Sequence, residues 1–220
     1  ENFTAVALPA GLQRIAAGAF SNCLNLKQMS LPAGLAEIGE NAFSGCGLTS
    51  IVFDDRGGND IILGDGCFAG NFSLSECILP EGITALPSNM LAGDWERGSS
   101  LPAIRIPASV ESLGSLVFDY CNDTVIFFMG PPPTVGEDGM TSVPESLANA
   151  MVVYQAAHQA AWADVLDDEG LFHGYRTESL TGEPIPRPEI ATPADKTTFL
   201  DSIVVTFTLI PRWLSTCARM

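Results

Sequence analysis

The sequence has 220 residues, with 26 acidic and 10 basic side chains and a formal net charge of −16. This excess of acid argues against binding to nucleic acids and to anionic membrane surfaces, because no basic stripe is present to neutralise phosphates. Hydrophobic residues make up 46% of the chain, enough to form a core, and no apolar run approaches the ~20 residues of a membrane helix, so we expect no membrane insertion.

Five copies of one pattern follow each other along the first part of the chain. They span residues 8–30, 31–52, 63–78, 79–94 and 106–127. In the first two copies, which begin LPAGLQRIAAGAFSNC and LPAGLAEIGENAFSGC, Phe20 aligns with Phe43, 23 residues later. A repeat of this length is typical of one coil of a solenoid, whose apolar side is buried only when coils stack on each other.

Each copy contains a short run of alternating apolar residues, which predicts a strand. The apolar side chains are expected to point inward, and the side chains between them to line one face of a parallel sheet. The expected inward positions are Phe3, Val6, Leu8, Leu26, Met29, Leu31, Leu48, Ile51, Phe53, Leu74, Cys77, Leu79, Leu101, Ile104 and Ile106. A proline after four of the predicted strands ends each one, since it has no N–H to donate.

The pattern LPxGLxxIxxxAFxxCxxLxxI resembles the BspA-like leucine-rich repeat family, also called the Treponema pallidum-type repeat, over roughly residues 1–130. The segments 130–140 and 150–166 resemble the closing turn of such arrays and their closing strand with a short helix. The resemblance implies a right-handed leucine-rich-repeat solenoid of the α/β type, mostly strand and loop, with a parallel β-sheet. It also implies secreted or cell-surface proteins, many of them bacterial, that act in adhesion or protein binding without catalysis.

The end of the array is expected to carry a cap, because a solenoid needs a terminal unit with one polar face. Trp162, Val165 and Leu166 form an apolar edge at helical spacing, which predicts a short helix. The segment 170–180 is expected to form one last strand. The predicted solenoid therefore spans residues 1–180, with the cap at about 130–180.

Residues 181–194 hold four prolines without periodicity, which indicates a linker. Beyond it, PADKTTFLDSIVVTFTL (193–209) is similar to the first strand of the immunoglobulin-like modules, including chitobiase C-terminal-type domains, that follow repeats in many surface proteins. Such a module needs about seven strands and ~100 residues. We therefore expect residues 195–220 to hold a truncated strand and a tail.

Three of the six cysteines, Cys23, Cys46 and Cys121, occupy the same repeat position. Neighbouring strands lie about 4.8 Å apart, which puts Cys23 and Cys46 within reach of a disulfide. The alternative is a ladder of reduced, buried thiols that fill space as small apolar groups. Cys217, in the tail, is expected to be exposed.

The sequence contains no pattern typical of a catalytic or cofactor site. Its two histidines, His158 and His173, belong to no triad pattern, so we expect no enzyme, no catalytic residue and no cofactor. The insertion DDRGGND carries Asp54, Asp55 and Asp60 near glycines, as hard-cation loops do. It gives a weak calcium hypothesis, beside the alternative of a solvated acidic turn.

The outward positions of the predicted sheet form the candidate binding surface. Towards the C-terminal coils these positions become apolar, and the candidate site consists of Val52, Ile78, Arg105, Val125 and Phe127. Exposed apolar patches larger than usual mark interaction sites. The alternative is that a later loop, such as 130–140, folds over Phe127.

Taken with the family resemblance, these features predict a secreted or cell-surface, adhesin-like bacterial protein that binds an extracellular protein or glycan on its sheet face. One alternative is a rigid structural spacer, and another is a carbohydrate-associated accessory module of a larger surface protein. An open, apolar sheet face favours binding, whereas a polar, featureless face favours the spacer.

Overall fold

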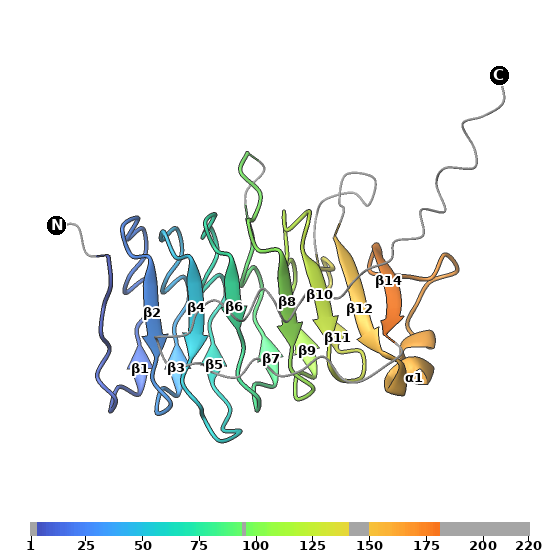
Figure 1. Ribbon diagram of the computed structural model, residues 1–220, viewed down its shortest axis with the longest axis horizontal. Helices are drawn as coiled ribbons and strands as arrows, with labels where there is room; N and C mark the ends of the chain where they lie inside the picture. Colours follow the sequence, from blue (N-terminus) through green and yellow to red (C-terminus); the bar gives the residue numbers. More distant parts are fainter. Residues whose placement is uncertain (1–3, 94–95, 141–149, 181–220) are drawn as a thin grey trace. The chain divides into compact units, whose positions relative to one another are not determined.

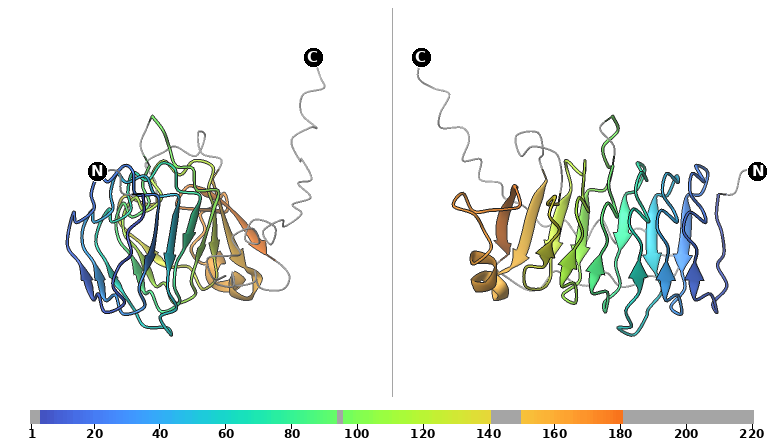
Figure 2. Two further views of the ribbon diagram at one scale, coloured as in Figure 1. Left: turned by 60° about the vertical axis from the view of Figure 1, so that its left-hand side comes forward. Right: turned by 180° about the vertical axis from the view of Figure 1, so that it is seen from behind.

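The structure is a computed structural model that describes residues 4–93, 96–140 and 150–180. Over these residues the chain forms a β-solenoid whose coils stack side by side in chain order (Figure 1 and Figure 2). Each coil contributes one strand to a long sheet and most contribute a two-residue strand to a shorter sheet.

The long sheet has eight strands, and all of its pairings are parallel except the one at its C-terminal edge. In spatial order they are β13 (Leu171–Phe172), β14 (Tyr175–Leu180), β12 (Met151–Gln155), β10 (Val125–Phe128), β8 (Ala103–Ile106), β6 (Glu76–Ile78), β4 (Ser50–Phe53) and β2 (Gln28–Leu31). The short strands form two three-stranded sheets, β1 (Arg14–Ile15), β3 (Glu37–Ile38) and β5 (Ile62–Leu63), and β7 (Ala85–Leu86), β9 (Ser112–Leu113) and β11 (Thr134–Val135).

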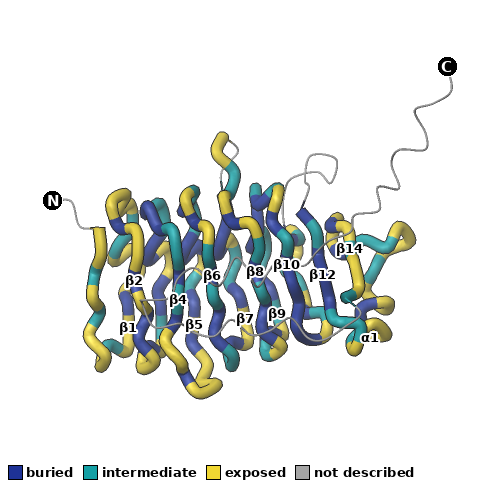
Figure 3. The backbone as a smooth tube through the Cα atoms, viewed as in Figure 1, coloured by how far each residue is buried: buried dark blue, intermediate teal, exposed yellow. Residues whose placement is uncertain are grey.

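The predicted inward and outward alternation is confirmed along the long sheet. In β2, β4 and β8 every second residue is buried, and the expected inward positions from Leu26 to Ile106 are all buried (Figure 3). In the opening copy, Val6 and Leu8 are only partly buried, and Phe3 lies outside the described residues. The strand register places inward residues of successive coils opposite each other, as in Met29 with Ile51 and Ile51 with Cys77. The stacked coils therefore share one continuous core.

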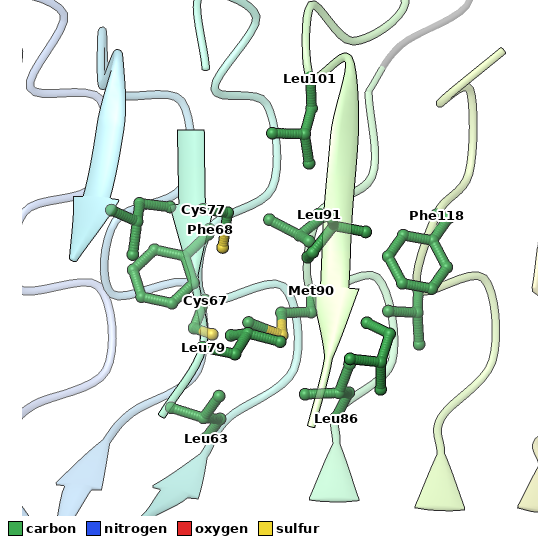
Figure 4. Close-up of a cluster of buried hydrophobic side chains, with 14 of the residues drawn as sticks. Leu63, Cys67, Phe68, Cys77, Leu79, Leu86, Met90, Leu91, Leu101 and Phe118 are labelled. Atoms are coloured by element: carbon green, nitrogen blue, oxygen red, sulfur yellow. The ribbon is translucent and has the colours of Figure 1, made fainter. Parts of the chain in front are cut away.

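Aromatic side chains from the turn side of each coil stack inside this core. Phe20 lies 5.0 Å from Phe43, and Phe43 lies 5.6 Å from Phe68, measured between ring centroids, with the rings nearly parallel. Leu91 occupies the same position in the next coil, and Phe118 in the one after it (Figure 4). The aromatic column therefore runs from Phe20 through Phe43 to Phe68, and buried Leu91 and Phe118 fill the same position in the next two coils.

The C-terminal end of the core is closed by the helix α1 (Gln159–Ala163), which a single 3-10 turn, Ala156–His158, precedes. Trp162 is fully buried, and its ring stacks on Tyr154 at 4.8 Å and meets the edge of Phe172 at 4.9 Å. Its Nε1 donates a hydrogen bond to the carbonyl oxygen of Gly130 over 3.2 Å. The predicted capping helix is therefore present, with Trp162 as its anchor.

Two details of the predicted cap are wrong. The segment expected to form one last strand forms two, β13 and β14, which pair antiparallel around a turn at His173 and Gly174. Both turn residues have positive φ, 49° and 83°, which is the geometry that two-residue hairpins prefer. Val165 is 46% exposed, because α1 ends before it.

The predicted linker, residues 181–194, and the predicted strand and tail, residues 195–220, lie outside the described residues. Among the residues that the structure describes, no helix is long and apolar enough to cross a membrane.

Candidate binding face

The outward face of the long sheet presents two rows of side chains, each formed by equivalent positions of successive strands. The first row contains Gln28, Ser50, Glu76, Ala103, Val125, Met151 and Arg176. The second contains Ser30, Val52, Ile78, Arg105, Phe127, Val153 and Glu178. The residues predicted to point outward therefore do lie at outward positions of the sheet, because one side chain per coil repeats at each such position.

Four of the five predicted site residues, Val52, Ile78, Arg105 and Val125, are half-buried at outward positions. Val52 and Ile78 are neighbours in the second row on β4 and β6, and Val125 and Met151 are neighbours in the first row on β10 and β12. We call these four apolar side chains the apolar strip; Arg105 on β8 lies between the two pairs. The fifth residue, Phe127, is only 5% exposed. Its ring is therefore not the open aromatic anchor that the sequence suggested.

Phe127 is buried on the outward side, apart from the main core. It lies opposite Arg105 on one side and Val153 on the other. Val153 is 3% exposed, and neither Val153 nor Phe127 belongs to the inward-facing core cluster. The C-terminal coils thus carry a second, smaller group of buried apolar side chains on the sheet face. This group stabilises the coils and leaves the ring of Phe127 inaccessible to a partner.

The sequence analysis missed the contribution of β12 to this face. Met151 and Val153 extend the two rows, with Met151 half-buried next to Val125. The sequence does indicate that Met151 and Val153 point outward, because they alternate with Val152 and Tyr154, which point into the core. The resemblance places this run in the cap, which is why it is absent from the predicted site.

The N-terminal part of the face is polar. Ser50 Oγ donates a 2.5 Å hydrogen bond to Glu76 Oε2, and Ser30 Oγ donates one of the same length to Asp54 Oδ1. Both are links between neighbouring coils on the surface. The face therefore mixes polar and apolar positions from β2 to β8 and becomes apolar on β10 and β12.

The insertion at residues 54–60 is organised by a buried arginine. Arg56 is 6% exposed, and its guanidinium donates to the carbonyl oxygens of Ala33, Asn59 and Asp60 over 2.9, 3.2 and 3.0 Å. Burial lowers the pKa of Arg56, and the nearby Asp60 carboxylate acts in the opposite direction. The guanidinium of Arg56 therefore attaches the loop to the preceding coil.

The three aspartates of the calcium hypothesis have separate hydrogen-bond partners. Asp54 accepts from a serine hydroxyl of β2, Asp55 from the backbone N–H of Gly57 over 3.0 Å, and Asp60 from the hydroxyl of Thr84 over 2.9 Å. Within residues 4–93, 96–140 and 150–180, no group of three or more His, Cys, Asp or Glu side chains is placed to hold a metal ion. The geometry therefore lends the calcium hypothesis no support.

Five cysteines lie in the described part of the chain, all as free thiols, and Cys217 lies outside it. Cys46, Cys67, Cys77 and Cys121 are buried, whereas Cys23 is exposed. Burial raises the pKa of Cys46 and Cys121 to about 11. Four of these thiols are therefore reduced and buried, as in the alternative to a disulfide, whereas Cys23 is not buried.

His173, in the turn of the last hairpin, contacts an aromatic ring. His173 packs edge-on against Phe172, with 4.8 Å between ring centroids, and burial lowers its pKa below the ordinary value. The side chain of His173 is exposed apart from this ring contact, which accounts for its place in the turn by packing.

Comparison with known proteins identifies the repeat. Residues 1–125 match the model of the BspA-type leucine-rich repeat region in six copies. Three of the similar solved structures are leucine-rich repeat proteins of bacteria.

A leucine-rich repeat protein from Bacteroides ovatus is 22% identical over 67% of this chain and 48% of its own, with a TM-score of 0.35. The leucine-rich repeat protein of T. pallidum is 21% identical over 81% of this chain and 86% of its own, with a TM-score of 0.44.

A leucine-rich cell surface protein from Faecalibacterium prausnitzii is 17% identical over 81% of this chain and 60% of its own, with a TM-score of 0.39. The chain spans about half the length of the Bacteroides ovatus protein. No curated protein matches the sequence.

Proposed function

Because this chain belongs to the BspA-type leucine-rich repeat family, we propose that it is a secreted or surface-attached, adhesin-like bacterial protein that binds a protein partner on the outward face of its long sheet. Leucine-rich repeat proteins generally bind other proteins and are typically not enzymes. The adhesin-like role, the surface location and the extracellular partner are our proposal for this chain.

The observation that carries the proposal is the apolar strip on the sheet face. Val52 and Ile78 lie opposite each other on adjacent strands, and Val125 and Met151 do so further along. An antiparallel or solenoid sheet with one face towards water normally alternates apolar and polar residues. Half-buried aliphatic side chains at successive outward positions thus provide area that a partner can remove from water.

The shape of the face and the charge of the chain restrict the kinds of partner that can bind. A sheet held by the stacked coils is ordered before binding, so little entropy is lost when a flat partner docks. The net charge of −16 favours a neutral or basic partner, with long-range attraction weakened at physiological salt. A protein with an apolar patch fits this surface better than a glycan, because the strip consists of aliphatic side chains.

The test uses a double variant with a matched control. Immobilised protein is exposed to extracellular-matrix and mucin preparations, and captured partners are compared between the wild type and Val52→Ser/Ile78→Ser. We expect the double variant to lose capture by at least about tenfold while its Tm stays within a few degrees. The control is Ile62→Ser, whose side chain is 68% exposed on the short sheet. It should bind as the wild type does.

Equal capture by the wild type and the double variant would overturn the proposal and favour the rigid spacer. Capture that survives proteolysis of the mucin but is lost after oxidation of its sugars would replace the protein partner by a glycan.

A further inference from the structure

The side chain three residues after the aromatic position connects the coils of Cys46, Asn71 and Cys121 to the preceding coil. The residues at this position are Cys23, Cys46, Asn71, Asp94 and Cys121. Cys46 Sγ donates to the carbonyl oxygen of Phe20 over 3.0 Å, and Asn71 Nδ2 donates to that of Phe43 over 2.9 Å. The side chain at this position therefore reaches back towards the preceding coil. Only the first two copies place cysteines in adjacent coils.

This geometry brings the sulfur of Cys46 next to the backbone of Cys23. The carbonyl oxygen of Phe20 accepts from Cys46 Sγ over 3.0 Å and also from the backbone N–H of Cys23 over 3.1 Å. The Cys23 backbone also hydrogen-bonds to the Cys46 sulfur itself. The buried thiol thus already lies on the side of its coil that faces Cys23.

The backbones of the two coils are also close enough for a disulfide. Two hydrogen bonds of 2.8 Å, from the N–H of Phe20 to the oxygen of Ala42 and from the N–H of Asn22 to the oxygen of Ser44, join the coils just before the two cysteines. Backbones paired in this way run roughly 5 Å apart, and disulfides join Cα atoms about 4.4–6.8 Å apart.

The side chain of Cys23 can turn towards Cys46. It is exposed, whereas Cys46 and Cys121 at the equivalent position are buried. An exposed side chain changes rotamer at little cost, so Cys23 is the partner whose sulfur is free to move.

We propose that Cys23 and Cys46 form a disulfide that joins the first two coils when the protein meets a disulfide oxidant such as oxidised glutathione. The Cys23 thiolate attacks one glutathione sulfur and releases the first glutathione thiolate. The thiolate of Cys46 then attacks Cys23 Sγ and releases the second. Two electrons pass from the two cysteine sulfurs to glutathione, and the two thiol protons pass to the glutathione thiolates or to solvent.

The cross-link would act where the solenoid is least buried. Four apolar side chains of the first coil, Val6, Leu8, Leu12 and Phe20, are only partly buried against the core, although Ile15 is buried. A bond from this coil to the second restricts its separation from the stack, and disulfides persist in the oxidising surroundings of secreted proteins.

The experiment uses the full chain with Cys217→Ser, so that the tail thiol cannot compete. The protein is equilibrated at pH 8 in a glutathione redox buffer, quenched with acid, alkylated under denaturing conditions and mapped by mass spectrometry. We expect a linked pair of peptides containing Cys23 and Cys46, with Cys67, Cys77 and Cys121 alkylated. The Tm should rise by roughly 5–10 °C, and the Phe20 and Asn22 amides should exchange more slowly.

The matched control, Cys23→Ser in the same background, should show neither the linked peptide nor the rise in Tm. Recovery of Cys23 as a mixed disulfide with glutathione, with Cys46 alkylated, would overturn the proposal. A Cys23–Cys46 link without any gain in Tm or amide protection would overturn its stabilising role.

Discussion

The side-chain amide of Asn71 donates a 2.9 Å hydrogen bond to the carbonyl oxygen of Phe43, one coil earlier. The same nitrogen donates to the oxygen of Phe68 over 2.8 Å, while Asn71 Oδ1 accepts from the backbone N–H of Leu48 over 3.2 Å. Asn71 is 6% exposed. One buried side chain therefore satisfies three backbone groups that would otherwise be paired with neither water nor protein.

Asn71→Ala should lower the free energy of unfolding by about 2–4 kcal/mol, because it leaves buried backbone groups without partners. Asn71→Cys should cost less, since the thiol of Cys46 makes the equivalent contact one coil earlier. Urea unfolding followed by circular dichroism measures both. An equal loss for the two variants would show that the thiol does not replace the amide.

Phe43→Ala should cost about 3–5 kcal/mol, because it empties a fully buried site. The ring lies between Phe20 and Phe68, so the cavity cannot close without moving two coils. Ile62→Ala, at a 68% exposed position, is the control and should change stability by less than about 0.5 kcal/mol. A loss below about 1 kcal/mol for Phe43→Ala would contradict the aromatic column.

Gly64→Ala should destabilise the solenoid by about 1–3 kcal/mol through overpacking. A Cβ at Gly64 would lie 2.4 Å from the backbone nitrogen of Glu40 in the preceding coil, so the coils would have to separate. The control is Gly11→Ala, where a Cβ would meet nothing within 4 Å. Thermal unfolding should show a lower Tm for Gly64→Ala only.

Phe127→Ser should lower the free energy of unfolding by about 3 kcal/mol, because the ring is buried on the sheet face. Ile78→Ser, at a half-buried position in the same row, should cost about 1 kcal/mol or less. Denaturant titrations compare the two. If Phe127→Ser leaves stability unchanged, the ring is accessible and returns to the candidate binding surface.

Stability should fall at alkaline pH because of the buried thiols. Burial raises the pKa of Cys77 to about 12 and that of Cys121 to about 11, whereas thiols in the unfolded chain ionise near pH ~8.5. The contribution of these groups is therefore fully present below pH ~8.5 and is lost as pH rises towards 11, by at most ~1.4 kcal/mol per pH unit for each thiol. Urea unfolding between pH 7 and 10 should show a shallower decline for Cys121→Ala, and an unchanged slope would contradict the assignment.

The sequence by itself determined the coil and its inward side. Leu31, Ile51 and Ile104 recur at fixed spacing, and a residue at a period-two position in a strand faces the core wherever successive coils stack. The aromatic column and the anchor Trp162 followed for the same reason, since each is a large apolar side chain that has to leave water.

The tertiary structure alone decided what lies at the outward and turn positions. Phe127 and Ile78 share one row of the sheet, yet only Phe127 is buried, because burial on that side depends on what packs over the row and not on the period. Arg56 is held by carbonyl oxygens of its own loop and of Ala33, 23 residues earlier, and Asn71 reaches Phe43, 28 residues earlier. Polar partners at such separations have no local sequence signal, because the hydrogen bonds form only after the coils have stacked.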